Sequence, residues 1–75
     1  MSRLPVISGK ELMNALKKTG FVVLRQKGSH VSMEKQDESG RWRTVVPMHR
    51  EVRPGTLHDI LKQTGVTRDD LIKLL

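Results

Sequence analysis

The chain has 75 residues, no cysteine, and fourteen lysines and arginines against eight acidic residues, which gives a net charge of +6. The lack of cysteine excludes disulfides, thiolate metal sites and a cysteine nucleophile, and no apolar run approaches the roughly 20 residues of a membrane-spanning helix. We therefore expect one domain over residues 1–75, located in the cytoplasm and without a signal peptide or membrane segment. Its basic surface is expected either to bind a polyanion or to serve only solubility.

A helix is predicted over residues 9–18. Ser8 and Glu11 have the spacing of a capping box, in which each side chain accepts a hydrogen bond from the backbone N–H of the other residue. Apolar residues follow at helical spacing. Gly20 suits the left-handed position at which a helix stops.

A β-hairpin is predicted next. Residues 21–26 are apolar and β-branched, Lys27-Gly28 is a turn signal, and residues 31–35 alternate in polarity. The favoured register pairs residues whose numbers sum to 55, so that Val22, Leu24 and Val31 share an apolar side. This register places His30 on the side away from the core, with Arg25 as its cross-strand neighbour.

The rest of the chain adds a strand and two helices. A polar loop over residues 36–40 leads to a strand over residues 41–48, which ends near a proline. A second helix is predicted over residues 54–64, and a short C-terminal helix begins near Thr67. The predicted fold class is α+β, with a three-stranded antiparallel sheet in the order α-β-β-β-α and the short C-terminal helix.

His30 is the candidate for proton transfer. Imidazole has the side-chain pKa nearest to neutrality, so it can accept and donate a proton at working pH. RNA carries its own nucleophile, the 2′-hydroxyl, and its cleavage needs a base, an acid and cations but no metal ion. Arg25 and Lys27 could stabilise the phosphate charge, and Gly28 could take a positive φ and let a phosphate approach the backbone.

Other polar residues leave alternatives open. His49 could contact RNA, transfer the second proton or be an exposed loop residue, and His58 is expected on the surface of the second helix. Trp42 could stack on a base or pack on the sheet or on a partner. Asp69 and Asp70 are explained as helix-capping residues. The histidines lack metal-ligand spacing, so no metal or cofactor is expected.

Several segments, spread over nearly the whole chain, together resemble a known family. They are Leu4–Leu12, Gly20-Phe21, Arg25–His30, Val46–His49, Gly55–Leu57 and Ile60–Val66. In this order and spacing the chain is similar to the HicA-type (YcfA-like) mRNA interferase toxins. The resemblance implies a double-stranded-RNA-binding-domain-like fold, with the helices on one face of the sheet.

The resemblance also implies a function. It implies the toxin of a type II toxin–antitoxin pair, an endoribonuclease that cleaves mRNA with His30, which falls on the family's glycine-serine-histidine motif. A HicB-type antitoxin would cover this histidine and the basic surface. We expect RNA contacts from Lys10, Arg25, Lys27, Gly28, Ser29 and His49. The chain departs from many relatives at Val31, where they have a second histidine or an aromatic residue.

Two other functions are consistent with the same residues. One is a basic RNA-binding module without catalysis, in which His30 contacts phosphate but transfers no proton. The other is a protein-interaction domain whose basic face binds an acidic partner.

Overall fold

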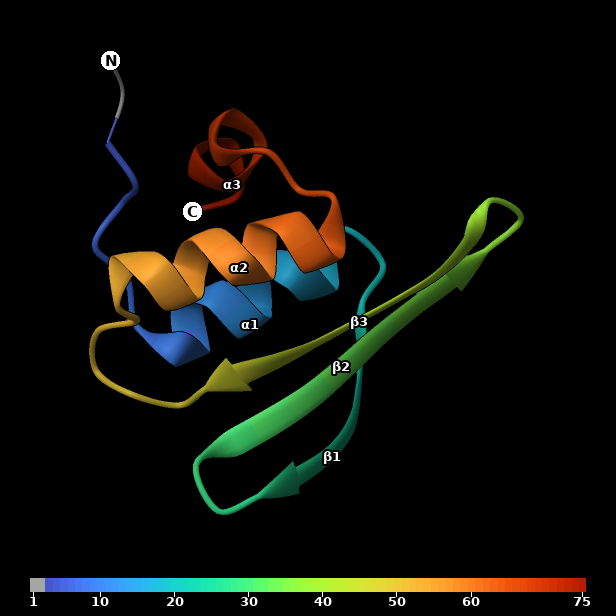
Figure 1. Ribbon diagram of the computed structural model, residues 1–75, viewed down its shortest axis with the longest axis horizontal. Helices are drawn as coiled ribbons and strands as arrows, with labels where there is room; N and C mark the ends of the chain where they lie inside the picture. The colour runs from blue at the N-terminus through green and yellow to red at the C-terminus, as the bar shows by residue number, and fades with distance from the viewer. Residues whose placement is uncertain (1–2) are drawn as a thin grey trace.

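The computed structural model describes residues 3–75. It contains α1 (Gly9–Lys18), β1 (Val22–Lys27), β2 (His30–Asp37), β3 (Gly40–Pro47), α2 (Pro54–Thr64) and α3 (Arg68–Leu74) (Figure 1). The strands form one antiparallel sheet in the order β1-β2-β3. The predicted α+β class and the order of the elements are therefore confirmed. None of the helices within residues 3–75 has the length and apolar character needed to cross a membrane.

The helices begin and end at the residues that the sequence signals indicate. The Ser8 hydroxyl accepts a hydrogen bond from the Glu11 N–H at 3.1 Å, and the Glu11 carboxylate accepts from the Ser8 N–H at 3.0 Å. Helix α2 begins with Pro54 at its first position and ends at Gly65, whose φ of 72° is left-handed. Thr67 caps α3. These ends are set by local backbone chemistry, which is why the sequence predicts them well.

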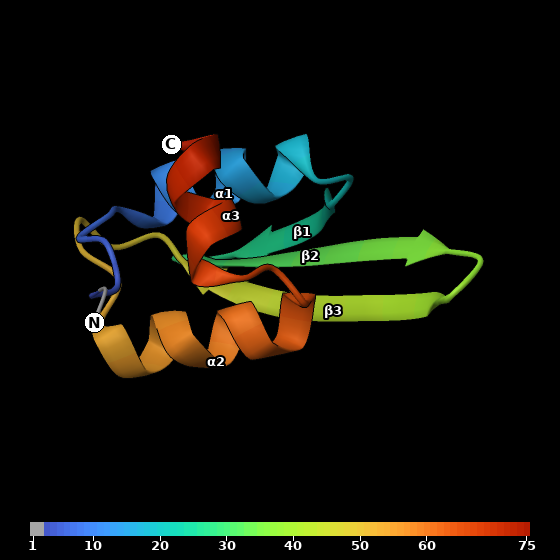
Figure 2. The ribbon, with the colours of Figure 1, turned by 90° about the horizontal axis from the view of Figure 1, so that it is seen from above.

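The core lies between one face of the sheet and the helices. Val31, Met33 and Val46 are buried on this face, whereas Ser32 and Val45, which point to the other face, are not. The helices contribute Leu12, Leu16, Leu57, Ile60 and Leu71 to the same cluster. In both views α1 and α2 run in the same direction, and their first turns lie near the end of β3 (Figures 1 and 2).

The first hairpin has a different register from the one that we expected. Lys27 pairs with His30 across the two-residue turn 28–29, and Arg25 pairs with Ser32. The expected pairing of Arg25 with His30 is therefore wrong. His30 does lie on the open face of the sheet, as predicted, but its cross-strand neighbours are Lys27 and, on the other side, Pro47 of β3.

The physical reason is that β1 is an edge strand outside the core. Every residue of β1 is exposed, and the exposed fractions are 57% for Val22, 40% for Val23 and 48% for Leu24. The prediction that Val22 and Leu24 face the core is wrong. Burial cannot select the register of an exposed strand, so the tight turn sets it, and an irregularity between Val23 and Arg25 absorbs the mismatch.

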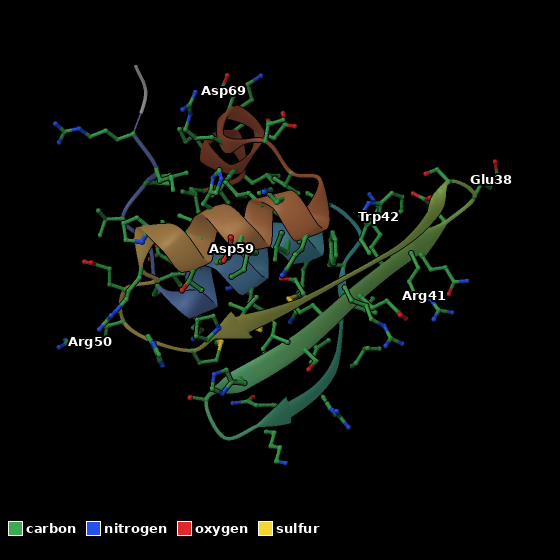
Figure 3. All side chains as sticks on the ribbon, viewed as in Figure 1. Glu38, Arg41, Trp42, Arg50, Asp59 and Asp69 are labelled. Atoms are coloured by element: carbon green, nitrogen blue, oxygen red, sulfur yellow. The ribbon has the colours of Figure 1, made fainter. Side chains whose placement is uncertain are left out.

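The second hairpin is also tighter than expected. Asp37 pairs with Gly40, so a two-residue turn replaces the predicted loop over residues 36–40. The Asp37 carboxylate accepts hydrogen bonds from the Ser39 hydroxyl at 2.7 Å and from the Ser39 N–H at 2.8 Å, and these bonds lower the pKa of Asp37. The tip of this hairpin, near Glu38 and Arg41, projects beyond the helices (Figures 2 and 3).

Candidate functional site

His30 is the first residue of β2, and the turn before it is held by one side-chain and one main-chain hydrogen bond. Gly28 has a φ of 60°, and its carbonyl accepts a hydrogen bond from the side-chain amide of Gln26 at 3.1 Å. The Ser29 carbonyl accepts a hydrogen bond from the Met48 N–H at 2.6 Å. The His30 side chain is exposed. The backbone therefore fixes the position of this residue, while its imidazole stays available to a ligand.

The segment that follows β3 is anchored from its other side by α1. The Gly9 N–H donates a hydrogen bond to the His49 carbonyl at 2.9 Å. A Cβ atom on Gly9 would overlap the Pro47 carbonyl and would lie 2.8 Å from the Met48 Cα, so only glycine allows this approach. The start of α1, residues 47–49 and the turn before β2 consequently form one connected unit.

These contacts bring two histidines to one hollow. The hollow has a volume of ≈ 410 Å³ and is lined by His30, Val45, Pro47, His49, Arg53 and Thr56. Both imidazoles are on exposed residues. Sequence reasoning identified His30 and His49 as candidates but did not predict that they share a hollow, because the contacts that bring them together are made by backbone atoms far apart in the chain.

Arg53 and Thr56 are site residues that sequence reasoning missed. Arg53 is the N-cap residue of α2, its side chain makes no capping hydrogen bond, and the first turn of α2 has no acidic residue. The positive end of the helix dipole is thus uncompensated and faces the hollow through Thr56. Pro54, without an acidic residue in the same turn, is the sequence signal that could have identified this helix start as a place for an anion.

A second, larger hollow adjoins the first. Its volume is ≈ 790 Å³, its lining comes from all three strands and from α2, and it shares Val45 and Thr56 with the smaller hollow. Arg25 lines this hollow instead of lying opposite His30. The Thr44 hydroxyl donates a hydrogen bond to the Gln63 side-chain oxygen at 2.7 Å, which joins β3 to α2 beside the hollow.

Charge compensation differs between the two ends of the sheet. Near the second hairpin, Glu34 forms ion pairs with Arg43 at 2.8 Å and with the more distant Arg41 at 3.4 Å. Around the two hollows, Arg25, Lys27 and Arg53 are exposed and make no ion pair with any residue from 3 to 75. Arg53 thus lines the hollow of His30 and Lys27 pairs with His30 in the hairpin, whereas Arg25 lines the larger hollow together with Arg43 and Asp59. Figure 3 shows Arg50 on the side of the molecule where β3 ends.

A comparison with protein families decides the membership of the chain. The sequence model described as the HicA toxin of bacterial toxin–antitoxin systems matches residues 9–66, which is most of the chain. The chain belongs to the HicA toxin family. The match extends from Gly9 through both hollows to the end of α2. No protein in a search of curated sequences matches significantly.

Membership in the HicA family makes the chain a toxin of a toxin–antitoxin system, with an antitoxin as its partner. The remaining expected RNA contacts have clear positions. Lys10 is exposed one residue after Gly9, and Lys27 is exposed opposite His30. Gly28 has the predicted positive φ. Ser29 takes part in holding the turn through its carbonyl, which accepts the hydrogen bond from Met48.

Three other residues considered in the sequence lie outside the hollows. Trp42 is partly buried against the core, with the Lys35 ammonium 5.9 Å from its ring centroid, so packing accounts for this side chain. His58 is exposed on α2, as predicted, and lines neither hollow. Asp69 lies in the first turn of α3, where Figure 3 places it far from the sheet. Within residues 3–75, no group of three His, Cys, Asp or Glu side chains is arranged to hold a metal ion.

Proposed function

We propose that this HicA-family toxin is a metal-independent endoribonuclease that cleaves mRNA by acid/base catalysis with His30. The observation that carries the proposal is the exposed imidazole of His30 in a hollow that it shares with Arg53 and the first turn of α2. Membership in a family of toxins that act on mRNA supports the same activity.

The chemistry requires only groups that this end of the molecule contains. The RNA 2′-oxygen attacks the adjacent phosphorus, the bond from phosphorus to the 5′-oxygen breaks, and the products carry a 2′,3′-cyclic phosphate and a 5′-hydroxyl. His30 would transfer a proton in this step, which contributes about 10²–10⁴ in rate. Arg53 and Lys27 supply positive charge for the phosphorane, and the free N–H groups of the first turn of α2 can bind its oxygens.

The larger hollow supports binding of the neighbouring nucleotides. It continues from the smaller hollow through Val45 and Thr56, and it contains the unpaired Arg25. A chain whose phosphate lies beside His30 can therefore extend along the open face of the sheet. With Phe21 buried and Trp42 packed against the core, polar and aliphatic groups replace aromatic stacking in this path.

We also propose that the antitoxin is of the HicB type and that it covers His30 and the uncompensated cations, with both proteins in the cytoplasm. An acidic surface on the antitoxin would neutralise Arg25, Lys27 and Arg53, which have no acidic partner within residues 3–75. Blocking the hollow is the simplest way to prevent RNA from reaching the imidazole.

The test measures cleavage of 5′-labelled RNA by the purified protein in the presence of EDTA. We expect 2′,3′-cyclic phosphate and 5′-hydroxyl ends, and a loss of at least about 10²-fold for His30→Ala. His58→Ala, an exposed histidine outside both hollows, is the matched control and should cleave at the parental rate.

Three results would contradict parts of this proposal. Parental activity in His30→Ala would exclude His30 as the group that transfers the proton. RNA binding without any cleavage by the parental protein would favour a non-catalytic RNA-binding module. Activity that EDTA removes and an added metal ion restores would overturn the metal-independent mechanism.

A further inference from the structure

Cleavage by the 2′-hydroxyl moves two protons on opposite sides of the phosphorus. The 2′-oxygen loses a proton as it attacks, and the 5′-oxygen gains one as it leaves, nearly in line with the attacking atom. One imidazole beside the phosphate can reach one of these oxygens during the displacement but not both. A second group that exchanges protons near neutral pH is therefore needed on the other side.

The smaller hollow contains one suitable second group. Besides His30, its lining consists of Val45, Pro47, His49, Arg53 and Thr56. The valine and proline side chains carry no exchangeable proton, the arginine stays protonated throughout the working pH range, and a threonine hydroxyl is neither a useful acid nor a useful base there. His49 remains, and histidine is the residue type best suited to accept and donate protons near neutral pH.

We propose that His49 is the second catalytic residue, so that His30 and His49 act as a base and acid pair on one phosphodiester. This inference rests on the ribonuclease activity proposed above and assigns the group that completes it. Of the three roles that the sequence leaves open for His49, it selects proton transfer over a contact to RNA and over an exposed loop residue.

The backbone geometry supports a catalytic pair because it holds both histidines in one frame. Ser29, next to His30, accepts the hydrogen bond from Met48, next to His49, at 2.6 Å. The His49 carbonyl is itself held by the Gly9 N–H at 2.9 Å. These bonds hold the backbone from which both imidazoles extend, and a fixed backbone is a requirement for proton transfer, which needs precise positioning.

The step balances without any other reactant. The bond between the 2′-oxygen and phosphorus forms, the neutral imidazole takes the 2′-proton and becomes charged, and the bond between phosphorus and the 5′-oxygen breaks. The other imidazole, charged at the start, gives its proton to the 5′-oxygen and becomes neutral. Solvent exchange restores the starting protonation states. Activity therefore requires one neutral and one charged histidine, which gives a bell-shaped dependence of kcat/KM on pH.

The test compares His49→Gln with His30→Gln, and His58→Gln serves as the matched exposed control. We expect kcat/KM to fall about 10²–10⁴-fold in both hollow variants and to stay unchanged in the control. Each hollow variant should lose one limb of the pH profile. Binding of an uncleavable RNA with a 2′-deoxy group at the cleavage position should change only a few-fold, because the cations that hold the phosphates remain.

A substrate with sulfur in place of the 5′-bridging oxygen identifies the acid. A thiolate leaves without protonation, so this substrate should restore most of the rate in the variant that lacks the acid and not in the variant that lacks the base. Both substituted side chains are exposed and the anchors are main-chain atoms, so the variants should fold, which thermal unfolding checks.

Several outcomes would overturn the assignment of His49. One is cleavage by His49→Gln at the parental rate. Another is a His49→Gln variant that loses RNA affinity and kcat/KM equally and keeps both limbs of its pH profile. The third is a sulfur substrate that restores the cleavage rate of neither His30→Gln nor His49→Gln. Failure of the ribonuclease proposal looks different, because the parental protein would then cleave no RNA at all.

Discussion

Replacing Gly9 with alanine tests the contact that connects α1 to the segment carrying His49. Gly9 is the first residue of α1, it is buried, and its N–H bonds to the His49 carbonyl. The chain offers a matched control in Gly55, which also lies in the first turn of a helix but is exposed, and a Cβ atom added there would have no neighbouring atom within 4 Å. Both changes add the same methyl group, so the difference between them isolates the contact.

The two substitutions should have effects of opposite sign. In a helix, alanine is favoured over glycine by about 0.5–1 kcal/mol, and Gly55→Ala should gain up to this amount. At Gly9 the added carbon would lie 2.8 Å from the Met48 Cα and 2.9 Å from the Pro47 carbonyl carbon, well inside the usual separation of about 3.5–4.0 Å. These neighbours are backbone atoms, so residues 47–49 must shift.

Overpacking of this kind costs about 1–3 kcal/mol, and weakening the hydrogen bond to His49 adds about 1 kcal/mol. We therefore expect Gly9→Ala to lower the free energy of unfolding by roughly 1–3 kcal/mol after the helix gain is subtracted. In a domain of this size, each kcal/mol corresponds to a shift of about 4–8 °C in Tm.

The assay is urea and thermal unfolding of the parental protein, Gly9→Ala and Gly55→Ala, followed by RNA cleavage below the lowest Tm. Cleavage by Gly9→Ala should be slower because His49 moves with its backbone. Equal stability of the two variants, or a gain in both, would show that helix propensity dominates at Gly9 and that the close approach to residues 47–49 carries no energetic weight.

Two further predictions concern single charges. Ser39→Ala should raise the pKa of Asp37 toward its ordinary value, because the Ser39 hydroxyl is the main cause of its lowering; an NMR titration of this carboxyl that shows no change would contradict the assignment. The pKa is lower in the folded state, so this bond stabilises the fold at neutral pH, and the contribution disappears as the pH falls through that lowered pKa. RNA binding by His30→Ala should weaken steeply with salt, with a slope of about −0.7 per neutralised phosphate. Arg53→Gln should reduce this slope by the amount that corresponds to about one phosphate. Arg41→Gln should change the slope less, because the Arg41 guanidinium already faces Glu34. RNA affinity that does not depend on salt in the His30→Ala protein would show that the cations do not bind phosphates.

The helices were predictable because their signals lie within a few residues of the helix ends. The capping box at Ser8 and Glu11, the proline at the start of α2 and the glycine at its end each act on the nearest peptide groups. No distant contact has to be known to place them. The side of His30 was predicted correctly from a register that is wrong, because the alternation along β2 alone already places His30 and the buried Val31 on opposite faces.

The hairpins were less predictable because their geometry depends on what covers them. The apolar residues Val22 and Leu24 indicated a buried strand, but β1 lies at the sheet edge beyond the cover of the helices. The polar run after Gln36 indicated a loop, but Asp37 and Ser39 close a two-residue turn through their own hydrogen bonds. Polarity predicted the solvent exposure of the second hairpin but not that of β1, and in neither case does it determine strand pairing.

The sequence did not predict which residues meet in the site, because the long-range contacts that bring them together are made by backbone atoms. Ser29, Met48 and His49 are connected through carbonyl and N–H groups, which every residue except proline provides, so their side chains leave no trace of this contact in the sequence. What the contact does require is space at Gly9 and a positive φ at Gly28. Glycines at these two positions are therefore structural requirements for bringing His30 and His49 to the same hollow. Substituting either glycine should impair the site without touching an imidazole.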